Sequence, residues 1–269
     1  MYKAIVLDLD GTLTNDAKEV TPKVKAALMA AQERGVRVVL ASGRPTYGIQ
    51  KIADELEIGR YDGYVMAFNG GRVCRWSDKE VIFEQKLRPE YVPTLYDAAM
   101  AAGCEILTYQ GEGIATTETE NKYVRHEAFI NKMPLVRYDD FVNQVEHPIN
   151  KCLIVGDPKP LAKLEQHMKE TMRGEMDFYR SAAFFLECVP LGIDKAASLD
   201  MLLSQLGIKR EETIAVGDGY NDLSMIRYAG LGVAMANAAR EVQDAADYIT
   251  YSHPEDGVAH VVEKFILRG

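Results

Sequence analysis

Three clusters of polar side chains each follow a short apolar run in the sequence. They are Asp8-Leu9-Asp10-Gly11-Thr12, Ser42-Gly43-Arg44 and Gly217-Asp218-Gly219-Tyr220-Asn221-Asp222, and Lys195 opens an expected helix further along the chain. Each cluster contains glycine, which lets the chain turn where an apolar strand ends. Because parallel sheets bind ligands outside the carboxyl ends of their strands, we expect these side chains to converge on one small volume.

The residue types at that place are suited to phosphoryl transfer on a metal ion. The carboxylates of Asp8, Asp10 and Asp218 repel one another unless a cation lies among them, and a set of oxygen ligands favours Mg²⁺. The Lys195 ammonium, the Ser42 hydroxyl and backbone N–H groups at the glycine turns donate hydrogen bonds to an anionic group. Together with a carboxylate free to attack, they predict phosphoryl transfer through an aspartyl-phosphate.

Each of these motifs is a weak signal alone, because Asp-x-Asp, Ser-Gly-Arg and Gly-Asp-Gly also occur as ordinary caps and turns. Their joint appearance in order, at matching strand ends, favours a phosphoryl site. The segment Asn69-Gly70-Gly71 has two open interpretations, a type I′ hairpin turn and a loop that borders the site.

The elements that position these residues form a β-α-β alternation at both ends of the chain. Strands are expected at 4–7, 36–41, 64–68, 213–217, 231–235 and 248–250, and helices at 22–34, 46–56, 195–206, 221–228, 237–246 and 257–267. The first strand is apolar throughout, as expected for a strand buried on both faces. This alternation predicts an α/β fold with a doubly wound, mostly parallel sheet.

The middle of the chain has a different pattern. Helices are expected at 89–102 and 160–172, and strands at 104–109, 113–117, 152–155, 176–180 and 184–189, with a polar stretch at 118–123. A segment of this length can be a domain of its own. We therefore expect an α+β domain at 83–189, inserted into a discontinuous core domain formed by 1–82 and 190–269.

Composition excludes several classes of protein. Of the 269 residues 47% are hydrophobic and 26% charged, which is typical of a globular protein, and the net charge is −9. The chain has neither the basic excess of a nucleic-acid binder nor about 18 consecutive apolar residues for a membrane span. The apolar run at the N-terminus is too short for a signal peptide. The four scattered cysteines suggest reduced thiols. We expect a cytoplasmic protein.

These motifs resemble those of the haloacid dehalogenase (HAD) superfamily of phosphatases. The segment 8–12 is similar to its first motif, Ser42 to the second, Lys195 to the third and 217–222 to the fourth. The long insert resembles the C2-type cap of the Cof-type sugar-phosphatase branch, as do Gly43-Arg44-Pro45, Asn69-Gly70-Gly71 and the segment 232–238. The resemblance implies a Rossmann-like core, a cap that selects the leaving group, and Mg²⁺ as cofactor.

The resemblance also implies roles for the acidic residues. Asp8 is expected to be the nucleophile, and Asp10 the general acid that protonates the leaving oxygen and then the base that activates water. Asp8, Asp218 and the backbone carbonyl of Asp10 are the expected ligands of Mg²⁺, with Asp222 supporting the metal or its waters.

The remaining motif residues are expected to bind phosphate. Ser42, Gly43, Lys195 and Asn221 hold the transferring group, and Lys195 also offsets the charge of the nucleophile. Ala196 follows the motif lysine where Cof-type members usually have glycine, and we expect the helix to start normally because alanine is a good helix former.

The expected function is hydrolysis of small phosphorylated metabolites, in particular sugar phosphates. A phosphomutase acting on hexose phosphates and a non-catalytic phospho-acceptor are the alternatives. Candidate specificity residues in the insert are the stretch 118–123 and Glu187. The oligomeric state is open.

Overall fold

The structure, a computed structural model, describes residues 1–268. The chain divides into two compact units. One consists of Met1–Phe83 and the described residues from Asp194 onward, and the other is Glu84–Ile193. The inserted domain expected at 83–189 stays a prediction, because compactness alone does not show that a unit folds independently.

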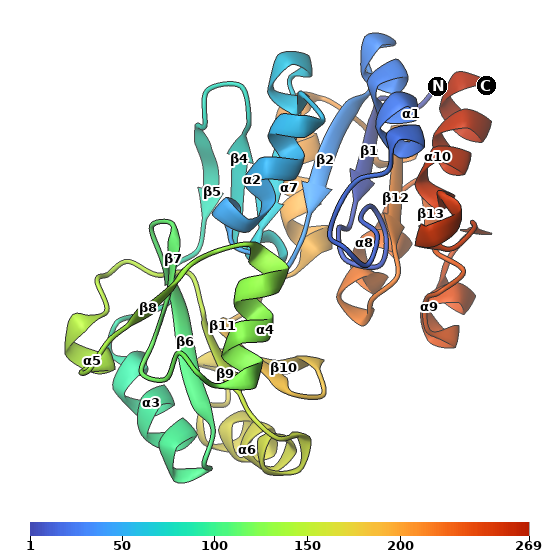
Figure 1. Ribbon diagram of the computed structural model, residues 1–269. Helices are drawn as coiled ribbons and strands as arrows, with labels where there is room; N and C mark the ends of the chain where they lie inside the picture. The colour runs from blue at the N-terminus through green and yellow to red at the C-terminus, as the bar shows by residue number, and fades with distance from the viewer. Residues whose placement is uncertain (269) are drawn as a thin grey trace. The chain divides into compact units, whose positions relative to one another are not determined.

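An eight-stranded sheet forms the centre of the first unit (Figure 1). Its strands lie in the order β14-β13-β12-β1-β2-β3-β4-β5. The bounds are β1 Ala4–Leu7, β2 Arg37–Ala41, β3 Tyr64–Ala67, β4 Arg72–Arg75, β5 Val81–Glu84, β12 Thr213–Gly217, β13 Leu231–Ala234 and β14 Tyr248–Ile249. The neighbours from β14 to β3 pair in parallel, and β4 runs antiparallel to β3. The predicted doubly wound, mostly parallel α/β fold is confirmed.

Helices cover both faces of this sheet (Figure 1). They are α1 Pro22–Glu33, α2 Thr46–Glu55, α7 Lys195–Leu206, α8 Leu223–Tyr228, α9 Arg240–Ala245 and α10 Gly257–Val262. Alternate residues of β1, such as Ala4 and Val6, pack on one face with Leu199 and Leu202 of α7 and Met225 of α8. The whole of β1 is buried, which explains its apolar sequence.

Local sequence signals set the helix that carries Lys195. The Asp194 side chain caps α7 by accepting from the backbone N–H groups of Ala196 and Ala197 at 2.9 and 3.0 Å. Gly207 ends the helix with a φ of +63°. The helix therefore begins at Lys195, as expected.

The second unit is a six-stranded sheet in the order β10-β11-β9-β6-β7-β8 with four helices. The bounds are β6 Glu105–Gln110, β7 Gly113–Thr116, β8 Leu135–Arg137, β9 Cys152–Val155, β10 Met176–Ala182, β11 Phe185–Pro190, α3 Tyr91–Ala101, α4 Lys122–Asn131, α5 Phe141–Gln144 and α6 Pro158–Thr171. Residues of α3, α5 and α6 form an apolar core with one face of the sheet. On the other face, Tyr109 of β6 donates a 2.6 Å hydrogen bond to Glu127 of α4.

Several segments differ from the sequence-based expectation. Strands β5 and β8 and helix α5 are not predicted from the sequence, and α9 begins at Arg240 rather than at 237. The polar stretch 118–123 leads into α4, which the sequence analysis does not predict. The expected helix 221–228 begins as a tight turn over Tyr220–Asp222, and the regular helix starts at Leu223. The last helix changes to a π-helical turn over Glu263–Leu267.

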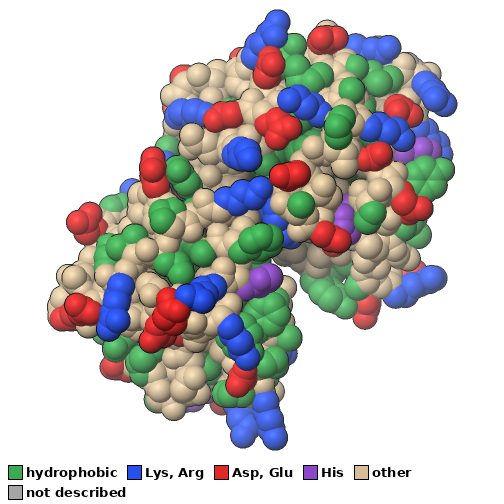
Figure 2. Space-filling view, viewed as in Figure 1, with side chains coloured by type: hydrophobic (Ala, Val, Ile, Leu, Met, Phe, Trp, Pro, Cys, Tyr) green, Lys and Arg blue, Asp and Glu red, His purple; other side chains and the backbone are tan. Residues whose placement is uncertain are grey.

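Cationic and anionic side chains are interspersed over the face of the molecule in Figure 2, without a continuous basic stripe. Over residues 1–268, the structure contains no helix with the length and apolar character needed to cross a membrane.

Candidate active site

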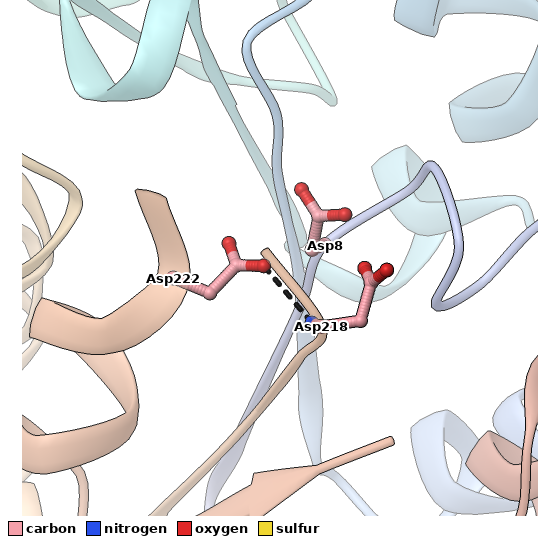
Figure 3. Close-up of side chains that lie close together, drawn as sticks. All are labelled: Asp8, Asp218 and Asp222. Carbon is pink, nitrogen blue, oxygen red and sulfur yellow. Dashed lines mark hydrogen bonds between the residues drawn. The ribbon is translucent and has the colours of Figure 1, made fainter. Parts of the chain in front are cut away.

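Three carboxyl groups from two distant parts of the chain meet at the carboxyl ends of β1 and β12. One oxygen from each of Asp8, Asp218 and Asp222 lies within 4.8 Å of the corresponding oxygens of the other two. Figure 3 shows the three side chains extending to the same side of the strand ends. The expected convergence of Asp8 with Asp218 is therefore present in the structure.

The strand register explains this meeting. β1 and β12 are parallel neighbours in which Leu7 pairs with Val216, so the two strands end side by side, just before Asp8 and Asp218. Asp222 is brought back by the tight turn that follows. One of its oxygens accepts from the backbone N–H of Asp218 at 3.1 Å (dashed in Figure 3) and from that of Gly219 at 2.9 Å.

Lys195 places a buried cation against this cluster. Its Nζ donates to Asp8 Oδ1 at 2.8 Å, to Asp222 Oδ1 at 2.6 Å and to the carbonyl oxygen of Ala41 at 2.9 Å. The residue is 1% exposed. Burial favours the neutral amine, but Asp222 and Asp8 outweigh it and raise the pKa of Lys195 above its ordinary value. The ammonium therefore stays charged.

One lysine does not neutralise three carboxyl groups. Burial, followed by the neighbouring carboxylates of Asp222 and Asp218, raises the pKa of Asp8 well above its ordinary value, although Lys195 acts in the opposite direction. Burial and Asp222 likewise raise the pKa of Asp218 to about 6. A hard divalent cation relieves such repulsion, and these donors are all oxygen atoms. The residues therefore fit a metal ion of this class.

Hydrogen bonds orient the Asp218 carboxylate. Thr12 Oγ1 donates to Asp218 Oδ1 at 2.9 Å, and Asn237 Nδ2 donates to Asp218 Oδ2 at 3.2 Å and to the carbonyl oxygen of Gly11 at 2.9 Å. Sequence reasoning quoted the segments that contain Thr12 and Asn237 but gave neither residue a role. The available signal was that Thr12 and Asn237 lie in segments that carry the family resemblance.

The side chain of Asp10 has other partners. Arg44 donates to it twice, from Nε to Oδ2 at 2.7 Å and from Nη2 to Oδ1 at 2.6 Å, and Lys18 Nζ lies 2.7 Å from Oδ1. Although burial opposes ionisation, the hydrogen bond from Arg44 and the charges of Arg44 and Lys18 lower the pKa of Asp10. The Asp10 carboxylate is thus ionised, and it lies outside the three-carboxylate cluster. The sequence placed Arg44 in one of the three converging clusters without a role of its own, and it did not single out Lys18.

Ser42, Gly43 and Asn221 lie on neighbouring turns. Ser42 is 2% exposed, and its hydroxyl oxygen accepts from the backbone N–H of Arg44 at 3.2 Å. Asn221 Nδ2 donates to Asn69 Oδ1 at 3.0 Å. Asn69 therefore borders the candidate site. The same segment also forms the turn between antiparallel β3 and β4, with positive φ at Asn69 and Gly70 and a 3.0 Å hydrogen bond from the backbone N–H of Gly71 to the carbonyl oxygen of Phe68, so both open interpretations describe it.

Comparisons with known proteins agree with this fold. A family model described as haloacid dehalogenase-like hydrolase matches residues 5–262. A hydrolase of that description from Bacteroides thetaiotaomicron has a crystal structure with a TM-score of 0.95 and 49% identity, covering 98% of this chain and 99% of that one. A sugar phosphatase of HAD subclass IIB aligns with a TM-score of 0.81 and 26% identity, covering 98% of both chains. A Bacillus subtilis 5-amino-6-(5-phospho-D-ribitylamino)uracil phosphatase is 28% identical, covering 98% of this chain and 96% of the relative.

Proposed function

The chain belongs to the family of haloacid dehalogenase-like hydrolases and is a phosphatase, and we propose that its activity depends on Mg²⁺. In this proposal the enzyme hydrolyses sugar phosphates through an aspartyl-phosphate. The observation that carries the proposal is the cluster of Asp8, Asp218 and Asp222 around the buried ammonium of Lys195. Similarity to a subclass IIB sugar phosphatase supports the substrate class. The cytoplasmic location expected from the sequence stays a prediction.

Asp8 and Asp10 divide the chemistry between them. A carboxylate oxygen of Asp8 attacks phosphorus, the bond from phosphorus to the leaving oxygen breaks, and that oxygen takes a proton from Asp10. Asp10 then removes a proton from water, the water oxygen attacks phosphorus, and the bond to Asp8 breaks. Arg44 and Lys18 hold Asp10 ionised, which suits the second step. For the first step, Asp10 has to take up a proton from solvent before it can pass that proton to the leaving oxygen.

Asp8, Asp218 and the backbone carbonyl of Asp10 are the proposed ligands of Mg²⁺, with Asp222 as a supporting group. The cation, when bound, neutralises charge on the transferring phosphoryl group. Asp222 orients Asp218 through its backbone N–H and ties Lys195 to the cluster.

The phosphoryl group is bound by Ser42, Gly43, Lys195 and Asn221 in this proposal. Lys195 offers a charge-assisted hydrogen bond, and its Nζ lies 2.8 Å from Asp8 Oδ1, so it also limits charge repulsion between Asp8 and the phosphate. The hydroxyl of Ser42 and the amide of Asn221 supply neutral donors.

The second unit is the proposed cap that selects the leaving group. Among its candidate specificity residues, Glu187 is 4% exposed and accepts from Lys151 Nζ and Ser181 Oγ, both at 2.7 Å. Tyr123, at the end of the 118–123 stretch, donates to Asp157 at 2.6 Å and stacks on Phe184. Glu187 is thus committed to a buried ion pair, which leaves the 118–123 stretch as the stronger candidate.

Mg²⁺ is expected to stabilise the protein more at pH 7.5 than at pH 5. Without metal, the folded-state pKa of Asp218 is about 6 against an ordinary 3.8, so its contribution to stability is full below 3.8 and is lost as the pH rises through about 6. Above that pH a cation binds the carboxylate without displacing a proton. We expect the melting temperature to rise by about 5 °C at pH 7.5 with Mg²⁺ near a hundred times its Kd, and less at pH 5.

Differential scanning fluorimetry measures this shift, with NaCl at equal ionic strength as the control for screening. The Asp218→Asn variant is expected to lose most of this shift in melting temperature.

Turnover of sugar phosphates is measured in parallel, before and after chelation of the metal. Free phosphate as the product, rather than an isomeric sugar phosphate or a lasting phospho-Asp8, separates hydrolysis from the phosphomutase and phospho-acceptor alternatives. An unchanged shift in Asp218→Asn, or turnover that survives chelation, rejects the metal role.

Gly11→Ala is expected to weaken metal binding by displacing Asp218. Gly11 has a φ of +83°, and a Cβ there would lie 2.3 Å from Asp218 Oδ2. Gly35 has the same φ of +83°, with nothing within 4 Å of the Cβ position. Both substitutions therefore cause similar backbone strain, of about 1 kcal/mol. Only Gly11→Ala displaces the Asp218 carboxylate, which is a proposed metal ligand. By isothermal titration calorimetry, the Kd for Mg²⁺ is expected to rise about tenfold or more in Gly11→Ala and to stay constant in Gly35→Ala. Equal affinities in the two variants argue against Asp218 as a ligand.

A further inference from the structure

The loop between β3 and β4 has a backbone conformation that non-glycine residues rarely adopt. Phe68, Asn69 and Gly70 have φ values of +54°, +55° and +96°, and all three residues are buried. Positive φ at Asn69 and Gly70 is usual for a hairpin turn of this kind, but it is uncommon for a bulky residue such as phenylalanine. Such backbone persists only where the surroundings hold it, and it gathers at functional sites. The contacts of this loop therefore indicate what it holds.

Those contacts run to three residues that are proposed to bind phosphate. The backbone N–H of Asn69 donates to the carbonyl oxygen of Ser42 at 2.9 Å. Its side-chain Oδ1 accepts from Asn221 Nδ2 at 3.0 Å. A Cβ on Gly43 would lie 3.2 Å from Asn69 Nδ2, so the amide group packs directly on Gly43. One residue thus links the turn after β2 to the turn after β12.

The residue type matches this position. Asparagine adopts the left-handed conformation more readily than most residues with a side chain, and its amide both accepts and donates hydrogen bonds. Asn69 is 5% exposed, so solvent has little access to its amide. At the next position, a Cβ on Gly70 would lie 2.7 Å from Ser198 Oγ, which donates to the carbonyl oxygen of Gly70 at 2.8 Å. The loop is therefore fixed against α7 as well.

We propose that Asn69 is a positioning residue for phosphate binding, acting by fixing the side chain of Asn221 and the backbone at Ser42 and Gly43. The inference rests on the proposed function, because the phosphate-binding roles of those residues are assigned there. Asn69 acts through these groups and not on the reacting atoms. Restricting the freedom of groups that contact phosphate raises the affinity for it, because less order has to be imposed on binding.

The test is a double-substitution cycle with inorganic phosphate as a competitive inhibitor. Asn69→Gly removes the amide and keeps the left-handed backbone accessible, and Asn221→Ala removes the group that Asn69 is proposed to position. We expect the Ki for phosphate to rise about fivefold in Asn69→Gly and about tenfold in Asn221→Ala. The double variant is expected to stay within about twofold of Asn221→Ala, because Asn69→Gly keeps the backbone N–H that contacts Ser42 and removes the amide that fixes Asn221.

Two further variants keep the result interpretable. Asp62→Gly is the matched control, since Asp62 is exposed, has a φ of +52° and lies in the same unit; its Ki is expected to equal that of the unmodified protein. Asn69→Ser, whose hydroxyl is too short to replace the amide, is expected to behave as Asn69→Gly. Melting temperatures of all variants show which ones remain folded during the assay.

The outcomes separate the two proposals. Multiplying effects in the double variant, of about fiftyfold, show that Asn69 and Asn221 act independently and overturn the inference. An unchanged Ki in Asn69→Gly and Asn69→Ser beside a raised Ki in Asn221→Ala also overturns it, and the proposed function stands. An unchanged Ki in Asn221→Ala rejects the phosphate-binding role of that residue, and the inference with it.

Discussion

Asp8→Asn is expected to abolish turnover while leaving the fold intact. The substituted amide is isosteric with the native carboxyl group but cannot form an acyl phosphate, so the loss is expected to be about 10⁴-fold or more in kcat. Burial and the nearby carboxylates already disfavour a charge at this position, so the neutral amide relieves repulsion. The melting temperature without metal is therefore expected to be equal or higher, as measured by scanning fluorimetry beside steady-state hydrolysis of an aryl phosphate.

Asp97→Asn is the matched control, because Asp97 lies on the exposed side of α3 in the second unit. It carries the same chemical change and is expected to retain full activity. If Asp8→Asn hydrolyses the aryl phosphate at a rate near that of the unmodified protein, Asp8 is not the nucleophile. If the variant is inactive and also unfolded, the lost activity reflects the lost fold. The expectation that the site accepts a neutral group at position 8 is then wrong.

Lys195→Met is expected to lower both catalysis and stability. The ammonium touches Asp8, Asp222 and a backbone carbonyl at hydrogen-bond distance, and the thioether replaces none of these contacts. Removing one partner of a buried ion pair costs about 3–5 kcal/mol, since the remaining charge is buried without compensation. The loss of a preorganised donor at the phosphoryl group is expected to lower kcat by about 10³-fold. Denaturant unfolding and steady-state kinetics measure the two effects.

The effect of Mg²⁺ on stability is expected to differ between the Lys195 cluster and a buried ion pair that binds no metal. In Lys195→Met, a divalent cation bound to Asp8 and Asp218 supplies positive charge, so Mg²⁺ is expected to recover part of the lost stability. Lys151→Met is the matched control, because Lys151 is 2% exposed and forms a 2.7 Å pair with Glu187 in the second unit. Its deficit is expected to be similar in size and insensitive to Mg²⁺. Recovery of both variants, or of neither, contradicts the assignment of the metal to the Lys195 cluster.

The meeting of Asp8 with Asp218 and Lys195 could be predicted because it depends on strand topology. Short apolar runs that end in glycine-containing turns identify buried parallel strands, and such strands carry their functional groups at one end. Lys195 follows a capping aspartate and opens a helix that Gly207 closes, which are local signals. Periodicity, caps and turns thus suffice for the elements and for the residues at their ends.

The orientation of individual side chains could not be predicted in this way. The pairing of Asp10 with Arg44 and Lys18 joins three separate segments, and no local pattern in the sequence specifies it. The left-handed backbone at Phe68 is equally hidden, because nothing in its residue type favours that conformation. Such features are determined by tertiary contacts rather than by propensity.

Helix α4 was not predicted, although the sequence contains a local signal for its start. The side chain of Asn121 accepts from the backbone N–H groups of Tyr123 and Val124 and so caps the helix. Asparagine before an amphipathic segment is a recognised start signal, but the polar run that precedes it favoured a loop. The buried residues of α4, Val124, Glu127 and Asn131, include only one that is apolar. The weak apolar stripe explains why periodicity did not reveal the helix.

The central claim is that Asp8 is the nucleophile. The most direct test is to identify the residue that becomes phosphorylated during turnover. In Asp10→Asn, with p-nitrophenyl phosphate as substrate, the good leaving group needs no proton donor, whereas hydrolysis of the aspartyl-phosphate still lacks its base. Rapid quenching followed by mass spectrometry of peptides is expected to find about one phosphoryl group per chain on Asp8, formed with the burst of nitrophenolate and before phosphate release. Phosphate released in step with nitrophenolate while Asp8 stays unmodified, or a phosphoryl group on another residue, would contradict it.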